Sequence, residues 1–111
     1  MATLTVNESS RSAAAITPDT PEIGGDQFAN TGFELLLVRH TNGGGSSATL
    51  TVPIQKQIDD EDVADKTISI GAGETHLVGP FPREFYNDAD GNVQLEWSSV
   101  DDLEVILLRK A

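Results

Sequence analysis

The sequence predicts an all-β protein, a single small β-sandwich or jelly-roll-like barrel with an extended N-terminal arm. Three observations predict this fold. Short apolar segments recur at regular spacing from residue 33 onward, turns rich in glycine and aspartate separate them, and no segment has the period of an amphipathic helix. A chain of 111 residues fits one domain. We therefore divide it into an arm at residues 1–32 and a β-sandwich at residues 33–111.

The arm is predicted from composition. After the short alternating stretch 3–6, the chain is rich in Ser, Ala, Thr and Pro as far as Gly24 and Gly25. This stretch has neither a 3.6-residue nor a two-residue period, and Pro18 would end any helix begun at Ala13. We expect an extended segment that can lie across a neighbouring subunit.

The sandwich is predicted from alternation. In segment 48–54, for example, Thr49 and Thr51 fall on one face, and the other face carries Ala48, Leu50, Val52 and Ile54. Comparable segments follow at regular intervals, and each ends at a glycine, proline or aspartate turn. The expected strands are 33–40, 48–54, 67–70, 76–78, 93–97 and 103–108.

Two of these strands, the first and the last, are apolar on both faces. A two-layer sandwich needs only one apolar face per strand. The faces with the larger apolar sets are Phe33, Leu35 and Leu37 on the first strand and Leu103, Val105 and Leu107 on the last. We expect the second faces, with Leu36 and Val38 on the first strand and Ile106 and Leu108 on the last, to be covered by the arm or by another subunit.

A cluster of aromatic residues is the other candidate contact. Phe81, Phe85 and Tyr86 lie within six residues, and Pro80 and Pro82 stiffen the loop that carries them. Aromatic side chains bury large areas and are enriched at interfaces. Two interpretations remain open: the loop plugs the end of the sandwich, or it anchors a partner.

The charge of the chain excludes several classes of partner. Eighteen acidic residues against seven basic ones give a formal net charge of −11. Such a chain repels nucleic acid and anionic membranes, so we expect it to bind neither. High acidity with only three lysines also suits a salt-rich cytoplasm, in which ions screen self-repulsion. A halophilic source is therefore one hypothesis, and an ordinary solubilising surface is the other.

The sequence offers little material for catalysis. It has no cysteine, and neither His40 nor His76 lies in a recognisable catalytic or metal-binding motif. The acidic stretches 59–62 and 88–92 are either solvated turns or cation sites, the second with the Asp-Gly signature of a tight hairpin. An EF-hand register around Gly91 fails because it places Trp97 where a glutamate is needed. We expect no enzyme activity and no cofactor.

Several loop signatures resemble those of a small β-protein family encoded among the head genes of tailed viruses. They occur in order as GGDQFAN at 24–30, DVADKT at 62–67, VGPFP at 78–82 and GNVQL at 91–95. The resemblance runs from about Gly24 to Arg109. The acidic loop at 59–62 and the overall acidity depart from the family pattern and fit a haloarchaeal host.

The resemblance implies a virion structural role, with attachment to the outside of the capsid as a decoration or cement protein. The implied partners are the major capsid protein and further copies of the chain, with trimers favoured and pentamers as the competing arrangement. Net negative charge favours the capsid exterior over the DNA-filled lumen. A head–tail connector, a tail component and a cellular β-sandwich module that binds carbohydrate or protein remain the alternatives.

Overall fold

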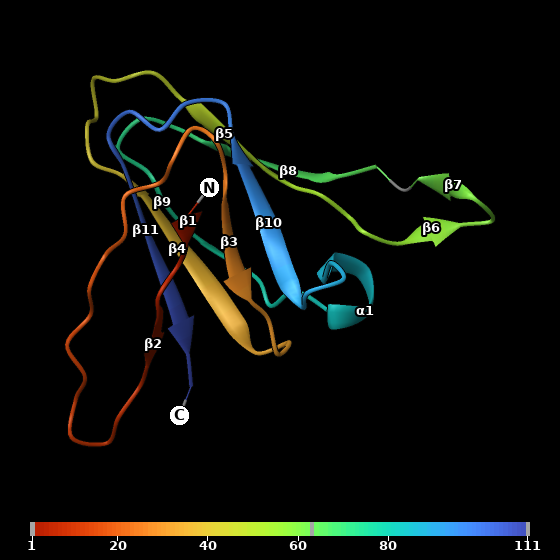
Figure 1. Cartoon of the computed structure of the whole chain (residues 1–111). Coiled ribbons are helices and arrows are strands. Elements are labelled where there is room, and N and C mark those ends of the chain that lie inside the picture. The colour runs from red at the N-terminus through yellow and green to blue at the C-terminus, as the bar shows by residue number, and fades with distance from the viewer. Residues whose placement is uncertain (1, 63, 111) are drawn as a thin grey trace.

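Two β-sheets form almost the whole protein, which confirms the predicted all-β sandwich (Figure 1). The computed structural model describes residues 2–62 and 64–110. The molecule measures 42 × 37 × 20 Å along its principal axes. Sheets in a sandwich pack about 10 Å apart, so the short axis has room for two layers and their outward side chains.

The first sheet has five strands, and each is antiparallel to its neighbour except the first pair, which is parallel. Its alternating apolar residues point into the sandwich, as the sequence predicts. In sheet order the strands are β1 (Ala2–Thr3), β3 (Asp26–Ala29), β10 (Asn92–Trp97), β5 (Ala48–Val52) and β8 (Lys66–Ile70).

The second sheet has four strands, and its longest two pair along seven residues. Parallel pairing adds the first strand at one edge of the sheet, and antiparallel pairing adds the last at the other edge. In sheet order the strands are β2 (Val6–Glu8), β11 (Leu103–Arg109), β4 (Glu34–His40) and β9 (Thr75–Val78).

The core lies between the sheets and draws on both ends of the chain. Phe28 of β3 and Leu4, between β1 and β2, are buried in it. The core consists of Leu4, Phe28, Leu36, Val38, Ala48, Leu50, Val52, Ile70, Val78, Phe81, Val93, Leu95, Trp97, Leu103, Val105 and Leu107.

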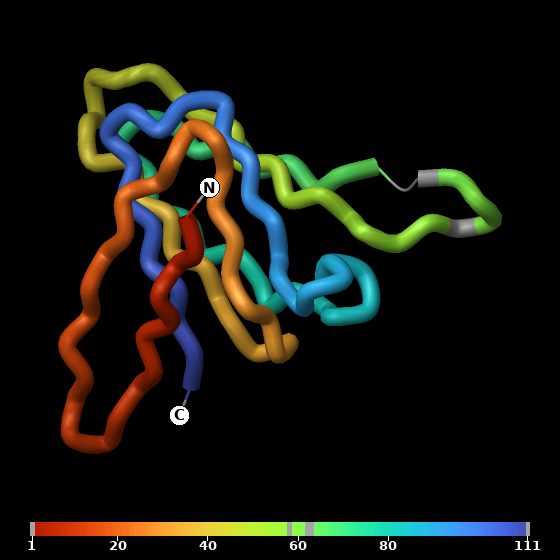
Figure 2. Tube along the Cα trace, in the orientation of Figure 1, coloured from red at the N-terminus to blue at the C-terminus, as the bar shows by residue number. Residues whose placement is uncertain are grey.

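The predicted boundary between an arm at 1–32 and a sandwich at 33–111 is wrong for most of the arm. Strands β1, β2 and β3 pair within the two sheets, and Leu4 and Phe28 fill the core. The longest part of this segment outside the strands is the connection between Glu8 and Asp26, which returns to the sheets at one bridge between Asp19 and Val105 (Figure 2). The strands were missed because β1 to β3 have two to four residues each, too few to show a period.

A hairpin and a short helix project from the sandwich on the side opposite the connection between Glu8 and Asp26 (Figure 1). The acidic stretch 59–62 forms the end of a hairpin of β6 (Gln57–Ile58) and β7 (Glu61–Asp62), which projects away from both sheets (Figure 1). Asp59 and Asp60 take φ values of 53° and 61°, as both central residues of a tight hairpin turn require. The short helix is α1 (Arg83–Tyr86), which the strand pattern did not predict.

The face that β4 turns to the core can be tested by substitution. Leu36→Ala should lower the free energy of unfolding by about 2–5 kcal/mol, because it leaves a cavity in a close-packed interior. Ile23→Ala is the control, since that side chain is 65% exposed and its loss should cost less than about 0.5 kcal/mol. Urea unfolding of both variants measures the difference. Equal stability of the two variants would contradict this assignment of the core face.

Candidate functional site

The outward side of the four-stranded sheet carries a continuous set of apolar side chains. Leu37 of β4 lies directly between Leu77 of β9 and Ile106 of β11, and Leu35 lies opposite Leu108. Directly opposed residues on one sheet face are close enough for their side chains to pack together. We call this surface the outer face; it comprises Phe33, Leu35, Leu37, Leu77, Ile106 and Leu108.

The members of the outer face differ in how far they are covered. Leu77, on the edge strand, is 61% exposed, and Phe33, just before β4, is 74% exposed. Ile106 is only 8% exposed, because β4 flanks it on one side and the chain returning at Asp19 flanks the other. The outer face thus has a well-packed centre and two large exposed side chains at its margin.

The charge of the outer face is unlike that of the whole chain. Arg39 forms an ion pair with Glu104 across the two central strands, and Lys110 follows the end of β11. On the outward sides of β4, β9 and β11 the charged residues are this one ion pair, so the excess of acidic residues that gives the chain −11 is not concentrated there. The acidic residues that repel other copies of the protein therefore lie mostly elsewhere.

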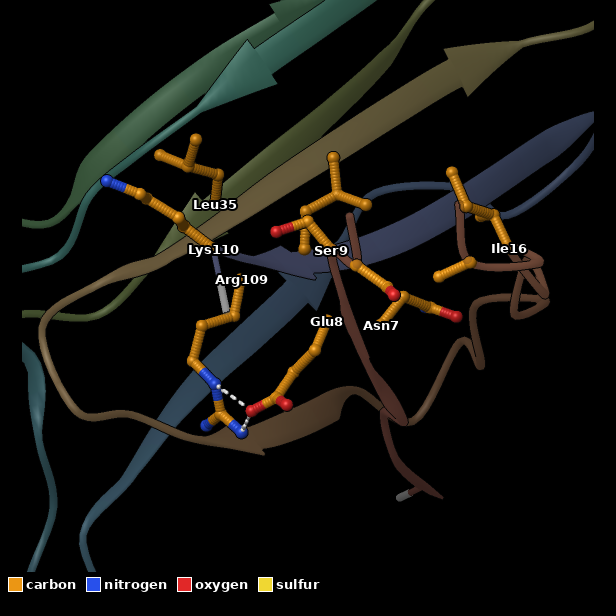
Figure 3. Close-up of a pocket in the computed structure, with 10 residues that line it drawn as sticks. Asn7, Glu8, Ser9, Ile16, Leu35, Arg109 and Lys110 are labelled. Carbon is orange, nitrogen blue, oxygen red and sulfur yellow. Dashed lines mark hydrogen bonds and ion pairs between the residues drawn. The ribbon is translucent and has the colours of Figure 1, made fainter. Parts of the chain in front are cut away.

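A pocket of about 340 Å³ opens where Leu35 and Leu108 meet the connection after β2 (Figure 3). In Figure 3, Ile16 lies on one side of this opening, and Lys110 lies beside Leu35 on the other. We call it the face pocket; it is lined by Asn7, Glu8, Ser9, Ser10, Ala14, Ile16, Leu35, Leu108, Arg109 and Lys110.

Hydrogen bonds fix the connection that walls the face pocket. The Asn7 side chain accepts the backbone N–H of Thr17 at 3.2 Å and donates to the carbonyl of Leu107 at 3.1 Å. Asp19 and Val105 exchange two backbone hydrogen bonds of 2.8 and 2.9 Å. The wall is therefore tied to the sheet at both ends, so that the pocket is formed before any ligand binds.

A buried carboxylate lies beneath the face pocket. Glu34 points into the sandwich, where it accepts hydrogen bonds from the Thr31 N–H at 2.7 Å and from Arg109 Nη1 at 3.1 Å. Burial by itself would raise the pKa of Glu34, but the hydrogen bonds from Thr31 and Arg109 outweigh it and lower the pKa below its ordinary value. Arg109 also donates hydrogen bonds to Glu8. Its hydrogen bonds to Glu8 and to Glu34 raise the pKa of Arg109.

A second apolar recess lies between α1 and the base of the projecting hairpin. Its volume is about 520 Å³, and Phe85 and Tyr86 form part of its lining. The Lys56 ammonium lies 4.9 Å from the centre of the Phe85 ring and 2.7 Å from Glu84. We call it the aromatic groove; it is lined by Ile54, Lys66, Gly79, Pro80, Phe81, Pro82, Phe85 and Tyr86.

The structure divides the seven predicted interface residues into three groups. Ile106 and Leu108 lie on the outer face, away from the core, and a contact through them stays a prediction. Phe85 and Tyr86 line the aromatic groove. The prediction is wrong for the remaining three, whose side chains are buried: Leu36 and Val38 inside the sandwich, and Phe81 at the inner wall of the aromatic groove.

The error on β4 has an identifiable cause. The inward face of this strand holds Glu34 and His40 at its two ends, so it looks less apolar than the outward face of Leu35 and Leu37. The buried His40 is satisfied locally, since its Nδ1 accepts the Asn42 N–H at 3.2 Å and its Nε2 lies 2.8 Å from the Ser46 carbonyl. Leu77 was missed for another reason, since its strand is too short to reveal which side faces out.

The aromatic loop acts in part as a plug, which was one of its two interpretations. Phe81 packs against Phe28 with ring centroids 5.8 Å apart and against Tyr86 at 5.4 Å in an edge-to-face arrangement. The Asn30 side chain donates to the Phe81 carbonyl at 2.8 Å and fixes the loop to β3. Phe81 therefore closes one end of the core, while Phe85 remains at the surface of the groove.

The acidic turns are organised by their own side chains. Asp88 accepts the N–H groups of Asp90 and Asn92, and these hydrogen bonds, with one from Gln94, lower the pKa of Asp88. The turn at Asp90-Gly91 exists, but it joins α1 to β10 and does not close the expected hairpin. Within residues 2–62 and 64–110, no group of three or more His, Asp or Glu side chains is placed to hold a metal ion.

Comparisons with known proteins give no match: no family model, no curated protein and no solved structure matches this chain significantly. Among the described residues, no helix is long and apolar enough to cross a membrane.

The buried carboxylate makes stability depend on pH. Because the pKa of Glu34 is lowered on folding, its stabilising effect is present above its ordinary pKa of about 4.5 and is lost as the pH falls through the folded value. Glu34→Gln should lower the free energy of unfolding by about 1–3 kcal/mol at pH 7, since a hydrogen-bonded charge is lost. The difference from the native protein should shrink below about pH 4. Urea unfolding at pH 7, 5 and 3.5 measures it, and a difference that does not depend on pH would contradict the role given to Glu34.

Proposed function

We propose that this protein is a structural component of a virus particle, bound to the outside of the capsid as a decoration or cement protein. The single observation that carries the proposal is the outer face, an apolar sheet surface that the fold itself does not need. Exposed apolar surfaces of this kind mark interaction sites. The loop signatures between Gly24 and Arg109 resemble those of head proteins from tailed viruses, and this resemblance supports a location in the virus particle.

The distribution of charge supports the capsid exterior. A chain with a net charge of −11 is repelled by packaged DNA, so the outside of the shell is the favoured side. Its partners there are the major capsid protein and other copies of itself. The outer face suits contact between copies, because its strands carry one internal ion pair on that side and therefore bring few like charges together.

The aromatic groove is the best candidate for the contact with the capsid. Phe85 is a large side chain at the surface, and Pro80 and Pro82 stiffen the loop that presents the groove, which lowers the entropy lost on docking. The projecting β6–β7 hairpin lies next to the groove and extends the reach of that side of the molecule (Figure 1). We assign attachment to the groove and the hairpin base.

Other virion positions, such as a head–tail connector or tail component, use the same kinds of surface and remain the second proposal. A cellular sugar-binding module is less well supported, because such modules present exposed aromatic platforms. Trp97, the largest aromatic residue, is buried and donates its indole N–H to Asp26 at 2.8 Å. It therefore offers no platform to a sugar ring.

Imaging of virus particles tests the proposal directly. Particles that contain the protein should show ordered density on the capsid exterior, and particles made without it should lack that density. Adding the purified protein back should restore the density, whereas Phe85→Ser should bind more weakly if the aromatic groove makes the attachment. Exterior density that is unchanged in particles without the protein would refute a decoration role.

Salt dependence tests the proposed halophilic origin. Since the screening length falls from about 10 Å at 0.1 M salt to about 3 Å at 1 M, a chain of −11 should gain stability over that range. We expect the thermal midpoint to rise steadily in KCl. A concentration series in sucrose, which strengthens burial without screening charge, is the control. A midpoint that does not respond to KCl would favour an ordinary solubilising surface.

A further inference from the structure

The outer face combines a projecting side chain with a recess that suits it. Phe33, at 74% exposed, is the most exposed of the large apolar side chains in the part of the chain that the structure describes. The face pocket, lined by Ala14, Ile16, Leu35 and Leu108 among others, lies on the same side of the same sheet. Phe33 immediately precedes β4 and lies two residues before Leu35, which lines the pocket, so the two-residue alternation of the strand puts both on the outer face.

A projection and a recess that share one face favour contact between two identical copies. In a two-fold contact each copy presents the same patch, and residue i of one meets residue j of the other in both directions. A rotation axis that passes between Phe33 and the pocket brings the projection of each copy to the recess of the other. A three-fold ring is a different case, because it needs the two features on different sides of the molecule.

Charge and shape agree with this partner. The chain as a whole repels itself at −11, yet the charged residues on the outward sides of β4, β9 and β11 are one cation and one anion paired with each other. Two copies packed through this face bring Leu37 and Leu77 out of water while keeping most acidic side chains apart. A pocket of about 340 Å³ lies within the range that binds compact apolar groups.

We infer that two copies of this protein associate face to face through the outer face, with Phe33 of each inserted into the face pocket of the other. The inference deepens the proposed function, on which it rests only for the assumption that the protein works through surface contacts. It replaces the expected trimer by a two-fold dimer as the unit that attaches to the capsid.

Sedimentation equilibrium of the full chain tests the inference in the absence of virus. The native protein should be a dimer at micromolar concentrations. Phe33→Ala should raise the dissociation constant roughly a hundredfold, because two symmetry-related contacts are lost and each buried Phe is worth at least a factor of ten. Ala14→Trp, which fills the pocket from its own wall, should weaken the dimer similarly. Ile23→Ala, at a side chain exposed elsewhere, is the matched control and should leave the dimer unchanged.

A mixture of the two weakened variants gives the sharpest test. A mixed dimer keeps one intact contact, the Phe33 of the Ala14→Trp chain in the open pocket of the Phe33→Ala chain. It should therefore be tighter than either variant alone, as measured with one chain fluorescently labelled. Circular dichroism checks that both variants fold, which is expected because both positions are exposed.

Three results would overturn the inference: a monomeric native protein, a trimer or pentamer, or a mixed dimer no tighter than the two homodimers. None of them bears on capsid binding. A dimer that fails to label particles would leave the inference standing and refute the proposed function. A monomer that labels the capsid exterior would refute the inference and leave the proposed function standing.

Discussion

The ion pair between the buried Glu34 and the partly exposed Arg109 is the constraint on which the arrangement of the second sheet depends. It joins the first residue of β4 to the last residue of β11, which are directly opposed in the sheet. A carboxylate is rarely buried without a partner, and here Thr31 and Arg109 supply one. With Glu34 turned inward, the two-residue alternation of the strand turns Leu36 and Val38 inward as well.

The same constraint leaves Leu35 and Leu37 on the outside. They meet Leu108 and Ile106 across the sheet and create an apolar face that the core does not use. The inward position of Glu34 thus accompanies the burial of Leu36 and Val38, and its partners offset the cost of burying a carboxylate on that face. A one-residue change of register would exchange the two faces, and it would leave Glu34 outside the reach of Arg109.

The long connection after β2 turns this face from a flat surface into one with a recess. Asn7, Asp19 and the backbone of Val105 hold it against the edge of β11, so that Ala14 and Ile16 stand beside Leu35 and Leu108. The segment that composition marks as an extended arm therefore has two roles. Its ends belong to the sheets, and its middle shapes the surface through which we propose that the protein contacts a second copy.

The sequence by itself determined the all-β class, the alternating core residues of β5, β10 and β11, and the net charge of −11. These follow from local periodicity and composition, which need no knowledge of neighbours. Only the tertiary structure decided which face of β4 is buried, that Phe81 closes the core, and that β1, β2 and β3 join the sheets. Each of these depends on a partner far away in the chain: Arg109 for Glu34, Phe28 for Phe81, and paired strands for segments too short to show a period. Local patterns cannot contain such contacts, because burial of a polar or short segment is decided by what lies against it.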